Sequence, residues 1–418
     1  MERKIPIGVQ SFERLRNDRY LYVDKTEYIY NLADQGRQYF LSRPRRFGKS
    51  LLLSTMRAYF EGKRELFDGL KIEELSQDDP DPWQAYPVFY FDFNRENYNR
   101  EAALEEVLEA HLKEWETLYG TTDEKVSLAI RFQQLLVRAS EKTGCGCVVL
   151  VDEYDKPLLD VLENTVLEEH NKEVFRGFFS ALKSFDQYIR FVFITGVTKF
   201  SKVSIFSDLN QLNDISMHED YAAICGITQS ELEDLFEPEM AILSKQNSMT
   251  EEETLQLLKR RYDGYHFHYR GSGIYNPFSL LKAFFEKDFG SYWFETGTPT
   301  FLVRRLKQLR FDARRFTNGS LYASESGLSD YRADSPDLVP LLYQTGYLTI
   351  ADYDLRRRRY TLSFPNEEVQ YGFLTSLASE YLPDSNPSDG TDIFALDEYI
   401  ENGDAVCSAI CGRSQETV

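Results

Sequence analysis

Short apolar runs that alternate with amphipathic helical patterns constrain the fold of this chain more than any other feature. The apolar runs occupy residues 38–41, 87–93, 147–151 and 190–194. The helical patterns fill residues 49–60, 101–118, 125–141 and 171–185. This alternation is typical of a mainly parallel β-sheet with crossover helices. We therefore predict an α/β domain for the first half of the chain.

From about residue 228 the pattern becomes dominated by helices. TQSELEDLF opens with the spacing of a capping box, in which Thr228 is the N-cap and Glu231 stands three residues on. Two strand-like segments, 347–353 and 359–364, predict a hairpin with an arginine-rich tip. We expect an α/β core at 1–227, a helical, lid-like or winged-helix-like region at 228–375, and a linker and tail at 376–418.

Composition excludes several classes of protein. The 418 residues carry a net charge of −20, which argues against a surface that binds nucleic acid over its whole area, so any such contact must be local. The five cysteines are an odd number without metal-ligand spacing and are expected to be reduced thiols. The charged N-terminus lacks the apolar segment of a secretion signal, and no apolar run reaches membrane-spanning length. We expect a cytoplasmic protein with no membrane partner.

The stretch SRPRRFGKS, residues 42–50, has the ending of a phosphate-binding loop but not its usual first glycine, because Arg43 stands there. Gly48, Lys49 and Ser50 follow an apolar strand and precede an apolar-faced helix, which is the right context for such a loop. Lysine reaches the β- and γ-phosphates of a nucleotide, and the hydroxyl binds Mg²⁺. A bare Gly-Lys-Ser is weak evidence, since a basic turn can end the same way.

CVVLVDEYD, residues 147–155, strengthens this interpretation. Four apolar residues end in Asp152 and Glu153, as when a buried central strand brings two carboxylates to its C-terminal edge. Asp152 can hold Mg²⁺, and Glu153 can orient or deprotonate an attacking water. The alternative is a buried strand that ends in a solvated acidic turn.

Two further strands refine the class. The run PVFYFDF lies between the two motifs and is long enough to be an extra strand that separates them, which favours the additional-strand class of P-loop ATPases. FVFITG ends in Thr195, where such ATPases carry a polar sensor of the γ-phosphate. A strand that ends in Thr-Gly is also ordinary turn chemistry.

Several ordered motifs resemble one family. IGVQSFERLRNDRYLYVDKT, SRPRRFGKSLL, VDEYDKPL, FITGVTKFSKVSIFSDLNQLNDIS, RRYDGYHF, YNPFSLL and SFPNEEV are similar to bacterial AAA-ATPase-like proteins that usually end in a PD-(D/E)XK nuclease-like domain. The resemblance covers residues from about 4 to 375. It implies an AAA- or STAND-like P-loop ATPase core with ATP and Mg²⁺ as cofactors, and it makes RPRRFGKS the family's own form of the phosphate loop.

The resemblance also implies site residues. Lys49 and Ser50 carry over as phosphate and Mg²⁺ ligands, and Asp152 and Glu153 as the metal-binding and water-activating acids. The nucleotide-binding set is the whole loop: Arg43, Pro44, Arg45, Arg46, Phe47, Gly48, Lys49, Ser50 and Leu51. Lys49, Glu153 and Thr195 form the expected catalytic set. The loop arginines could instead pair with surface acids. Asp24, Lys25 and Thr26 form a family signature that we expect beside the nucleotide.

The C-terminus departs from the family pattern. No Glu-X-Lys triplet follows Glu368, so the acids and lysine of a PD-(D/E)XK site are missing. We expect no nuclease activity, and we interpret the tail AVCSAICGRSQETV as that of a truncated or frameshifted product.

The leading hypothesis is a slow Mg²⁺-dependent ATPase that acts as a conformational switch in DNA-related, defence or signalling processes. It is expected to be slow because the candidate arginine fingers, Arg176 and Lys183, fit surface charges equally well. A non-catalytic nucleotide-binding module is the first alternative. A DNA-binding accessory factor that uses Arg356, Arg357, Arg358 and Arg359 is the second. The helical region could contact a second copy or a protein partner.

Overall fold

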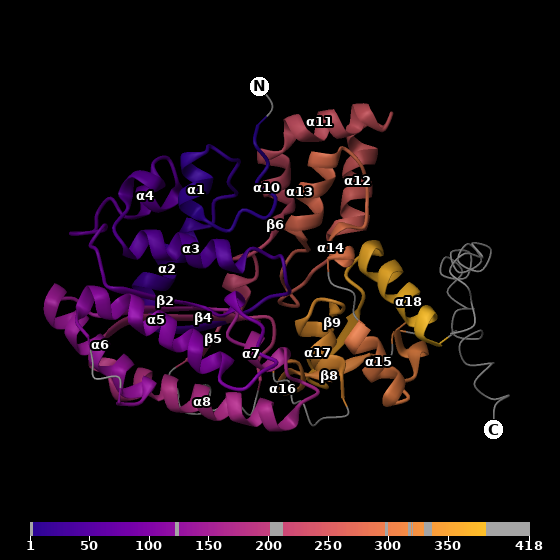
Figure 1. The fold of residues 1–418 in the computed structure, drawn as a ribbon. Coiled ribbons are helices and arrows are strands. Elements are labelled where there is room, and N and C mark those ends of the chain that lie inside the picture. The colour runs from indigo at the N-terminus through magenta and orange to yellow at the C-terminus, as the bar shows by residue number, and fades with distance from the viewer. Residues whose placement is uncertain are drawn as a thin grey trace. The chain divides into compact units, whose positions relative to one another are not determined.

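The computed structural model describes residues 3–121, 125–200, 212–296, 300–316, 319, 321–329 and 337–381. The described residues form two compact units that divide between Cys225 and Gly226 (Figure 1). The predicted tail, from residue 382 on, and the stretch 201–211 of one family motif lie outside the described residues. None of the described helices is both long enough and apolar enough to span a bilayer.

A five-stranded sheet forms the centre of the first unit, in the order β2-β3-β4-β1-β5. Its four longer strands match the predicted apolar runs, and all the pairs are parallel. The strands are β1 (Gln38–Ser42), β2 (Val88–Asp92), β3 (Cys147–Asp152), β4 (Ile189–Gly196) and the short β5 (Asn213–Asp214). β3 is buried along its whole length, which explains its continuous apolar sequence.

The predicted separating strand was the wrong one. PVFYFDF does form β2, but β2 lies at the edge of the sheet, beside β3. β4 lies between β1 and β3 instead. The sequence places 87–93 between the two motifs along the chain, and chain order does not determine neighbours in a parallel sheet, because crossover helices can carry the chain past several strands.

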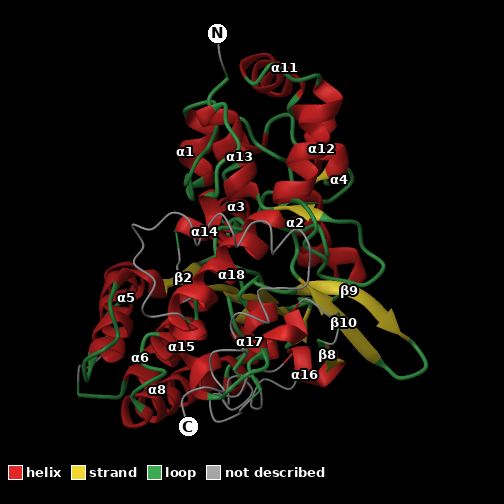
Figure 2. Cartoon of the chain, turned by 90° about the vertical axis from the view of Figure 1, so that its right-hand side faces the viewer, coloured by secondary structure: helices red, strands yellow, loops and turns green. Residues whose placement is uncertain are grey.

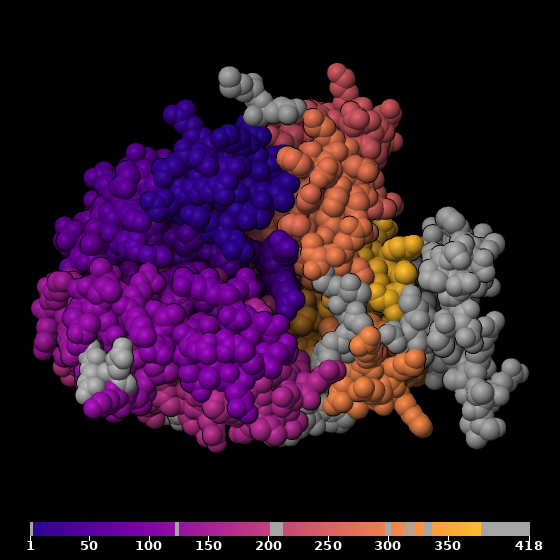
Figure 3. All heavy atoms as spheres, viewed as in Figure 1, coloured from indigo at the N-terminus to yellow at the C-terminus, as the bar shows by residue number. Residues whose placement is uncertain are grey.

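Helices cover both faces of this sheet. α3 (Lys49–Phe60), with α1 (Phe12–Asn17) and α4 (Lys71–Leu75), lies on one face, and α6 (Leu128–Thr143) and α8 (Thr165–Ser184) lie on the other (Figure 1). The remaining helices are α2 (Thr26–Gln35), α5 (Ala103–Tyr119) and α7 (Lys156–Leu159). In the space-filling view, indigo N-terminal residues form the α1 side of this unit and magenta residues the α8 side (Figure 3). An α/β sheet buried between helices is confirmed as the fold class.

The second unit is helical, with small antiparallel sheets. β6 (Ile227–Thr228) pairs with β7 (Ile274–Tyr275), and a separate sheet has the order β8-β10-β9. Its helices are α10 (Gln229–Leu235), α11 (Glu237–Gln246), α12 (Glu251–Tyr262), α13 (Pro277–Glu286), α14 (Tyr292–Glu295), α15 (Thr300–Gln308), α16 (Glu325–Ser329), α17 (Val339–Gln344) and α18 (Glu367–Tyr381). The capping box of Thr228 and Glu231 is present, and Thr250 and Glu253 form a second one.

The predicted hairpin is confirmed. β9 (Thr349–Asp354) and β10 (Arg359–Ser363) pair antiparallel around the arginine-rich tip, and β8 (Tyr322–Ser324) adds a third strand that the sequence did not indicate. β8 is only three residues long, too short for an alternating pattern to be recognised.

Three family motifs of the second unit meet in its core. The side-chain amide of Asn366 donates to the carbonyl of Asp263 at 2.9 Å, and Ser279 donates its hydroxyl to Glu368 at 2.7 Å. Gly264 has φ +92°, and a Cβ there would overlap the carbonyl oxygen of Pro365. RRYDGYHF, YNPFSLL and SFPNEEV are therefore joined by packing and hydrogen bonds, which gives each motif a structural reason.

Candidate nucleotide-binding site

The loop of residues 43–48 connects the end of β1 to the first turn of α3. Gly48 precedes the helix with φ 95°, and Arg46 also has a positive φ, 69°. Two left-handed residues turn the chain sharply, and glycine adopts this conformation at little cost. The N-terminus of the twelve-residue α3 opens onto this loop, where free backbone N–H groups and the helix dipole favour an anion.

Lys49 lies across the inside of this loop. Its side chain is buried, and Nζ donates to the carbonyl oxygens of Arg43 at 3.0 Å and Pro44 at 3.2 Å. Among the described residues its hydrogen bonds go to these two neutral carbonyls, while the carboxyls of Glu153 and Asp155 interact with its charge from nearby. A cation taken from water is stabilised far better by an anion in direct contact. The arrangement is suited to receive negatively charged oxygens at the mouth of the loop.

Arg43 occupies the place of the usual first glycine, and its side chain turns back into the protein. The guanidinium is only 1% exposed and donates to the carbonyl oxygens of Ser216 at 2.7 Å and Tyr221 at 2.9 Å. It also donates to the carbonyl of Ser42 at 2.9 Å. These bonds tie the start of the loop to the segment after β5, so the guanidinium anchors the loop and would contact phosphate only after giving them up.

The other loop residues divide into buried and exposed ones. Pro44 and Phe47 are buried and lie on the protein side of the loop, whereas Arg45, Arg46 and Gly48 are exposed. Ser50 and Leu51 are partly buried in the first turn of α3. The exposed guanidinium groups of Arg45 and Arg46 thus lie where an anion could reach them.

The acidic pair stands at the same edge of the sheet as this loop. Asp152 ends β3, next to β4, and β4 pairs with β1 so that Thr195 lies opposite Leu41. Because the three strands are parallel, their carboxyl ends all meet at this edge. Thr195 is fully buried and donates its hydroxyl to Oδ1 of Asp152 at 2.9 Å. Tyr90, on β2, donates to Oδ2 at 3.3 Å.

Glu153 adopts an unusual backbone conformation, with φ 50°. Left-handed geometry is uncommon for a glutamate and is often found at functional sites. Burial raises the pKa of its carboxyl, while the charges of Lys49 and Arg45 act in the opposite direction. A carboxyl with a raised pKa is a better proton acceptor than an ordinary surface glutamate once it is ionised.

Asp155 was not predicted as a site residue, although it stands only two positions beyond Glu153. It is 1% exposed, and its Oδ2 accepts from the backbone N–H groups of Val197 at 3.0 Å and Thr198 at 2.6 Å. The Thr198 hydroxyl donates to the same oxygen at 2.8 Å. Asp155 thereby fastens the acidic loop after β3 to the segment that follows β4.

Tyr154 reinforces this connection, which we call the β3–β4 clamp and define as Tyr154, Asp155, Gly196, Val197 and Thr198. Its hydroxyl donates to the Thr198 carbonyl at 2.9 Å, and its own N–H donates to the carbonyl of Thr195. A Cβ on Gly196 would come within 2.5 Å of Asp155 Oδ1. A third acid in VDEYD and the glycine in ITGVT were the only signals for the clamp in the sequence.

Two residues of the Val-Asp-Lys-Thr signature, Asp24 and Thr26, have a structural role. Oδ1 of Asp24 accepts from the Thr26 hydroxyl at 2.7 Å, and Oδ2 accepts from the N–H of Lys71 at 2.7 Å. Both side chains therefore hold the start of α4, since Thr26 also accepts from the N–H of Ile72. The place expected for the signature beside a nucleotide stays a prediction.

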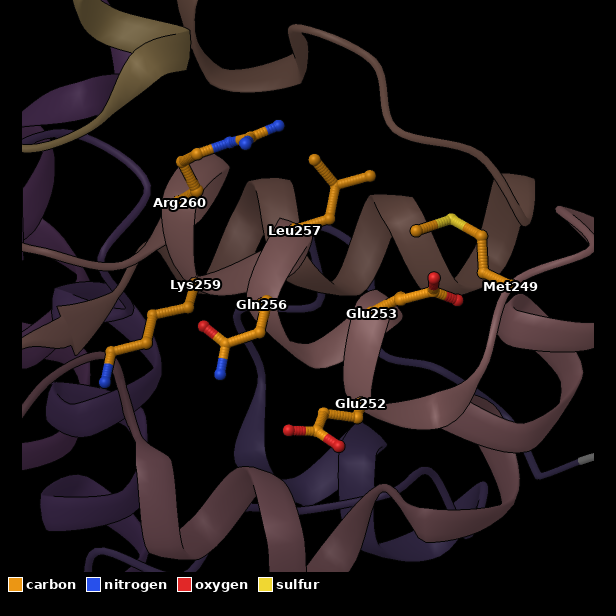
Figure 4. Close-up of a pocket in the computed structure, with 7 residues that line it drawn as sticks. All are labelled: Met249, Glu252, Glu253, Gln256, Leu257, Lys259 and Arg260. Carbon is orange, nitrogen blue, oxygen red and sulfur yellow. The ribbon is translucent and has the colours of Figure 1, made fainter.

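A concavity lies on the exposed face of α12 in the second unit. It is lined by Met249, Glu252, Glu253, Gln256, Leu257, Lys259 and Arg260 (Figure 4). In the close-up, Lys259 and Arg260 extend away from each other. Its side chains come almost entirely from one helix face and do not converge on a point, so it lacks the polar convergence of a ligand site.

The site and the sheet order together define the class: a phosphate-binding loop after β1, an acidic pair after β3 and a polar residue after the inserted β4 form a P-loop ATPase fold of the additional-strand class. A family model described as "Predicted AAA-ATPase" matches residues 6–206. A protein of Azotobacter chroococcum mcd 1, named "Uncharacterized protein in vnfD 5'region", is 38% identical over 394 residues, which are 91% of this chain and 71% of that protein. The chain belongs to the predicted AAA-ATPase family.

Among solved structures, the crystal structure of Cdc6p from Pyrobaculum aerophilum aligns with 85% of this chain and 93% of its own. The identity is 12% and the TM-score 0.27, so this likeness places no residue of the site. Membership of the family supports nucleotide binding of the ATPase type.

Proposed function

We propose that the chain binds and hydrolyses ATP with Mg²⁺ and uses the nucleotide state as a conformational switch. The observation that supports this most is the convergence of a buried Lys49, the α3 N-terminus and Asp152–Glu153 at one edge of the sheet. Phosphates need backbone N–H groups and a cation, and hydrolysis needs an acid beside them. Nothing in the ordinary packing of an α/β domain requires a lysine buried against loop carbonyls.

The donor set fits a magnesium nucleotide. The hydroxyl of Ser50 and the carboxylate of Asp152 are hard oxygen ligands of the kind that Mg²⁺ prefers, and both belong to the elements that meet at this edge. When bound, the metal supplies neutralisation of phosphate charge. Lys49 and the loop N–H groups hold the phosphates, with Arg45 and Arg46 as further contacts.

Glu153 orients the attacking water and accepts its proton in this proposal. Burial raises the pKa of its carboxyl, which makes the carboxylate a stronger base, and the charge of Lys49 offsets part of this rise. Thr195 senses the γ-phosphate through the Asp152 carboxylate to which its hydroxyl is bonded. Hydrolysis is slow without a partner, because Arg176 and Lys183, the candidate fingers, are exposed on α8 and need another surface to act upon.

The switch is used in a DNA-related, defence or signalling process in the cytoplasm, with a second copy or a protein partner engaged through the helical unit. An alternative is a module that binds nucleotide without turnover. The left-handed Glu153 favours hydrolysis, since a purely structural site gains nothing from holding a glutamate in a costly conformation.

Calorimetry with ATP, with and without Mg²⁺, and phosphate release test the proposal. Lys49→Ala should lose binding, and Glu153→Gln should bind with near-normal affinity but lose turnover, by a factor on the order of 100 or more. Lys63→Ala is the matched control, because Lys63 is a lysine of the same unit that pairs with Glu61 at 2.9 Å on the surface. No binding by the wild type would overturn the nucleotide site. Binding without phosphate release would favour the non-catalytic alternative.

A further inference from the structure

The tip of the β9–β10 hairpin concentrates positive charge in a chain that is otherwise strongly acidic. Leu355, Arg356, Arg357 and Arg358 form the tip and are exposed, and Arg359 begins β10. Figure 2 shows the hairpin projecting from the helices around it. Four consecutive arginines in a protein of net charge −20 are unlike its general surface.

The backbone turn of the tip is hydrogen-bonded to its own aspartate. Asp354 accepts from the backbone N–H groups of Arg356 and Arg357, both at 3.0 Å, and from the Arg357 guanidinium at 2.9 Å. The N–H and side chain of Arg357 therefore lower the pKa of the Asp354 carboxyl. This carboxylate neutralises Arg357 and shapes the turn, and within the described residues it leaves the guanidinium groups of Arg356 and Arg358 with no hydrogen bond or ion pair.

Arg359 is held by a different contact. Its guanidinium lies 3.8 Å from the ring centroid of Tyr322, a residue of β8 that is 40% exposed. This cation–π contact fixes Arg359 beside the neighbouring strand and leaves the tip to the other arginines.

An aromatic ladder continues along the other face of the hairpin. The ring centroids of Tyr353 and Tyr360 lie 4.5 Å apart and those of Tyr269 and Tyr353 lie 4.7 Å apart, with the rings tilted by 39° and 34°. Arg270 lies with its guanidinium 5.2 Å from the ring of Tyr269. The residue Thr349 fixes this loop against β9, because its hydroxyl accepts from the N–H of His266 at 2.7 Å. Arg270, an exposed cation from a separate segment, therefore lies next to the aromatic ladder of the hairpin.

We propose that the hairpin tip, Leu355 to Arg358, together with Arg270, binds the phosphate backbone of double-stranded DNA. The exposed guanidinium groups of Arg356 and Arg358 suit phosphate oxygens, and a turn whose backbone is already hydrogen-bonded loses little backbone entropy on binding. The major groove of B-DNA is wide enough to admit a two-stranded β-ribbon. A narrow minor groove attracts arginine side chains. Leu355, 69% exposed at the same turn, is an apolar side chain of the kind that wedges between base steps.

The acids around the tip set the strength of this contact. Asp354 is already bonded within the turn. Asp352 on β9 is exposed, and the charge of Glu325 on α16 acts on Tyr360 of β10. Both reduce the positive potential, so binding is expected to be local, independent of sequence and strongly dependent on salt. This interaction surface belongs to the second unit and does not depend on nucleotide hydrolysis.

The test is a titration of the full chain against a fluorescently labelled 20-base-pair DNA duplex at several salt concentrations. Replacing Arg356 and Arg358 by alanine should reduce the slope of log affinity against log salt by about 1.8, since each phosphate contact contributes about 0.9. Between roughly 50 and 200 mM salt the wild type would then lose about 12-fold more affinity than the variant.

The control double variant, Arg260→Ala with Lys282→Ala, changes the net charge of the same unit by the same amount. Both of these cations already pair with carboxylates, Arg260 with Glu367 and Lys282 with Glu286, each at 2.8 Å. An unchanged slope in this control, with a reduced slope in the tip variant, supports the proposal. No DNA binding by the wild type, equal loss in both variants, tighter binding to duplex RNA, or binding to anionic phospholipid vesicles in place of DNA would each overturn it.

Discussion

Removal of the Asp155 carboxylate should strongly destabilise the first unit, because three buried donors depend on it for their hydrogen bonds. The carboxylate accepts from two backbone N–H groups and one hydroxyl, at 3.0, 2.6 and 2.8 Å, in a fully buried position. Asp155→Ala leaves all three donors without a partner, and each buried unsatisfied donor costs about 1–3 kcal/mol. Because the variant also removes a poorly solvated charge, we expect a net loss of about 3–5 kcal/mol.

Thr198→Val is the matched milder change, because it removes only the hydroxyl and keeps both N–H groups bonded to Asp155. It should cost about 1 kcal/mol. In thermal unfolding of the full chain, the transition of the first unit should shift by about 2–4 °C for Thr198→Val and by on the order of 10 °C for Asp155→Ala.

The clamp also predicts a functional effect that stability alone would not produce. Since Asp155 lies two residues after Glu153 and holds the segment after Thr195, loosening it should lower the rate of phosphate release more than the affinity for ATP. Thr198→Val, which remains folded, is the variant for this assay. Equal thermal shifts in the two variants, or a loss of affinity with an unchanged rate, would refute the reasoning.

Three other outcomes are expected. Burial raises the pKa of Glu368 from 4.5 to about 7, so the folded state retains a proton that the unfolded chain has lost. The free energy of unfolding of the second unit should therefore fall by about 3 kcal/mol between pH 4.5 and 7. Urea unfolding should show this slope in the wild type and not in Glu368→Gln. Gly264→Ala should destabilise the same unit by more than about 2 kcal/mol in the same assay, because of its positive φ and the Pro365 carbonyl. Thr195→Val should weaken the dependence of ATP affinity on Mg²⁺, measured by calorimetry, because Asp152 loses a donor that orients it.

Much of the fold follows from the sequence, because burial dictates residue types. The continuous apolar run of β3 and the amphipathic pattern of α3 were both recognisable, and the predicted bounds of α3 agree with the structure. The order of the strands was not recognisable, since the periodicity of a strand says which faces are buried but not which strand lies beside it. The position of residues 87–93 along the chain therefore predicts a separating strand where the structure has β4.

Residues of the candidate site could be recognised in the sequence where their combination is rare and not where it is common. Gly48-Lys49-Ser50 before a helix is uncommon enough to be noticed, whereas an aspartate after an acidic pair is not. The function of Asp155 depends on N–H groups of Val197 and Thr198, and backbone donors leave no mark in a sequence. The inward direction of Arg43 was hidden for the same reason, because its partners are carbonyl oxygens.

The anchored Arg43 has a consequence for how this loop can change in evolution. Its guanidinium satisfies the carbonyl oxygens of Ser216 and Tyr221, which are far along the chain. Replacement of Arg43 by glycine would give the common loop sequence. It would also remove the donor to these two carbonyl oxygens and leave a cavity of the size of the side chain. The arginine is thus tied to partners outside the loop, and homologues with glycine at this position are expected to differ in the segment 216–222 as well.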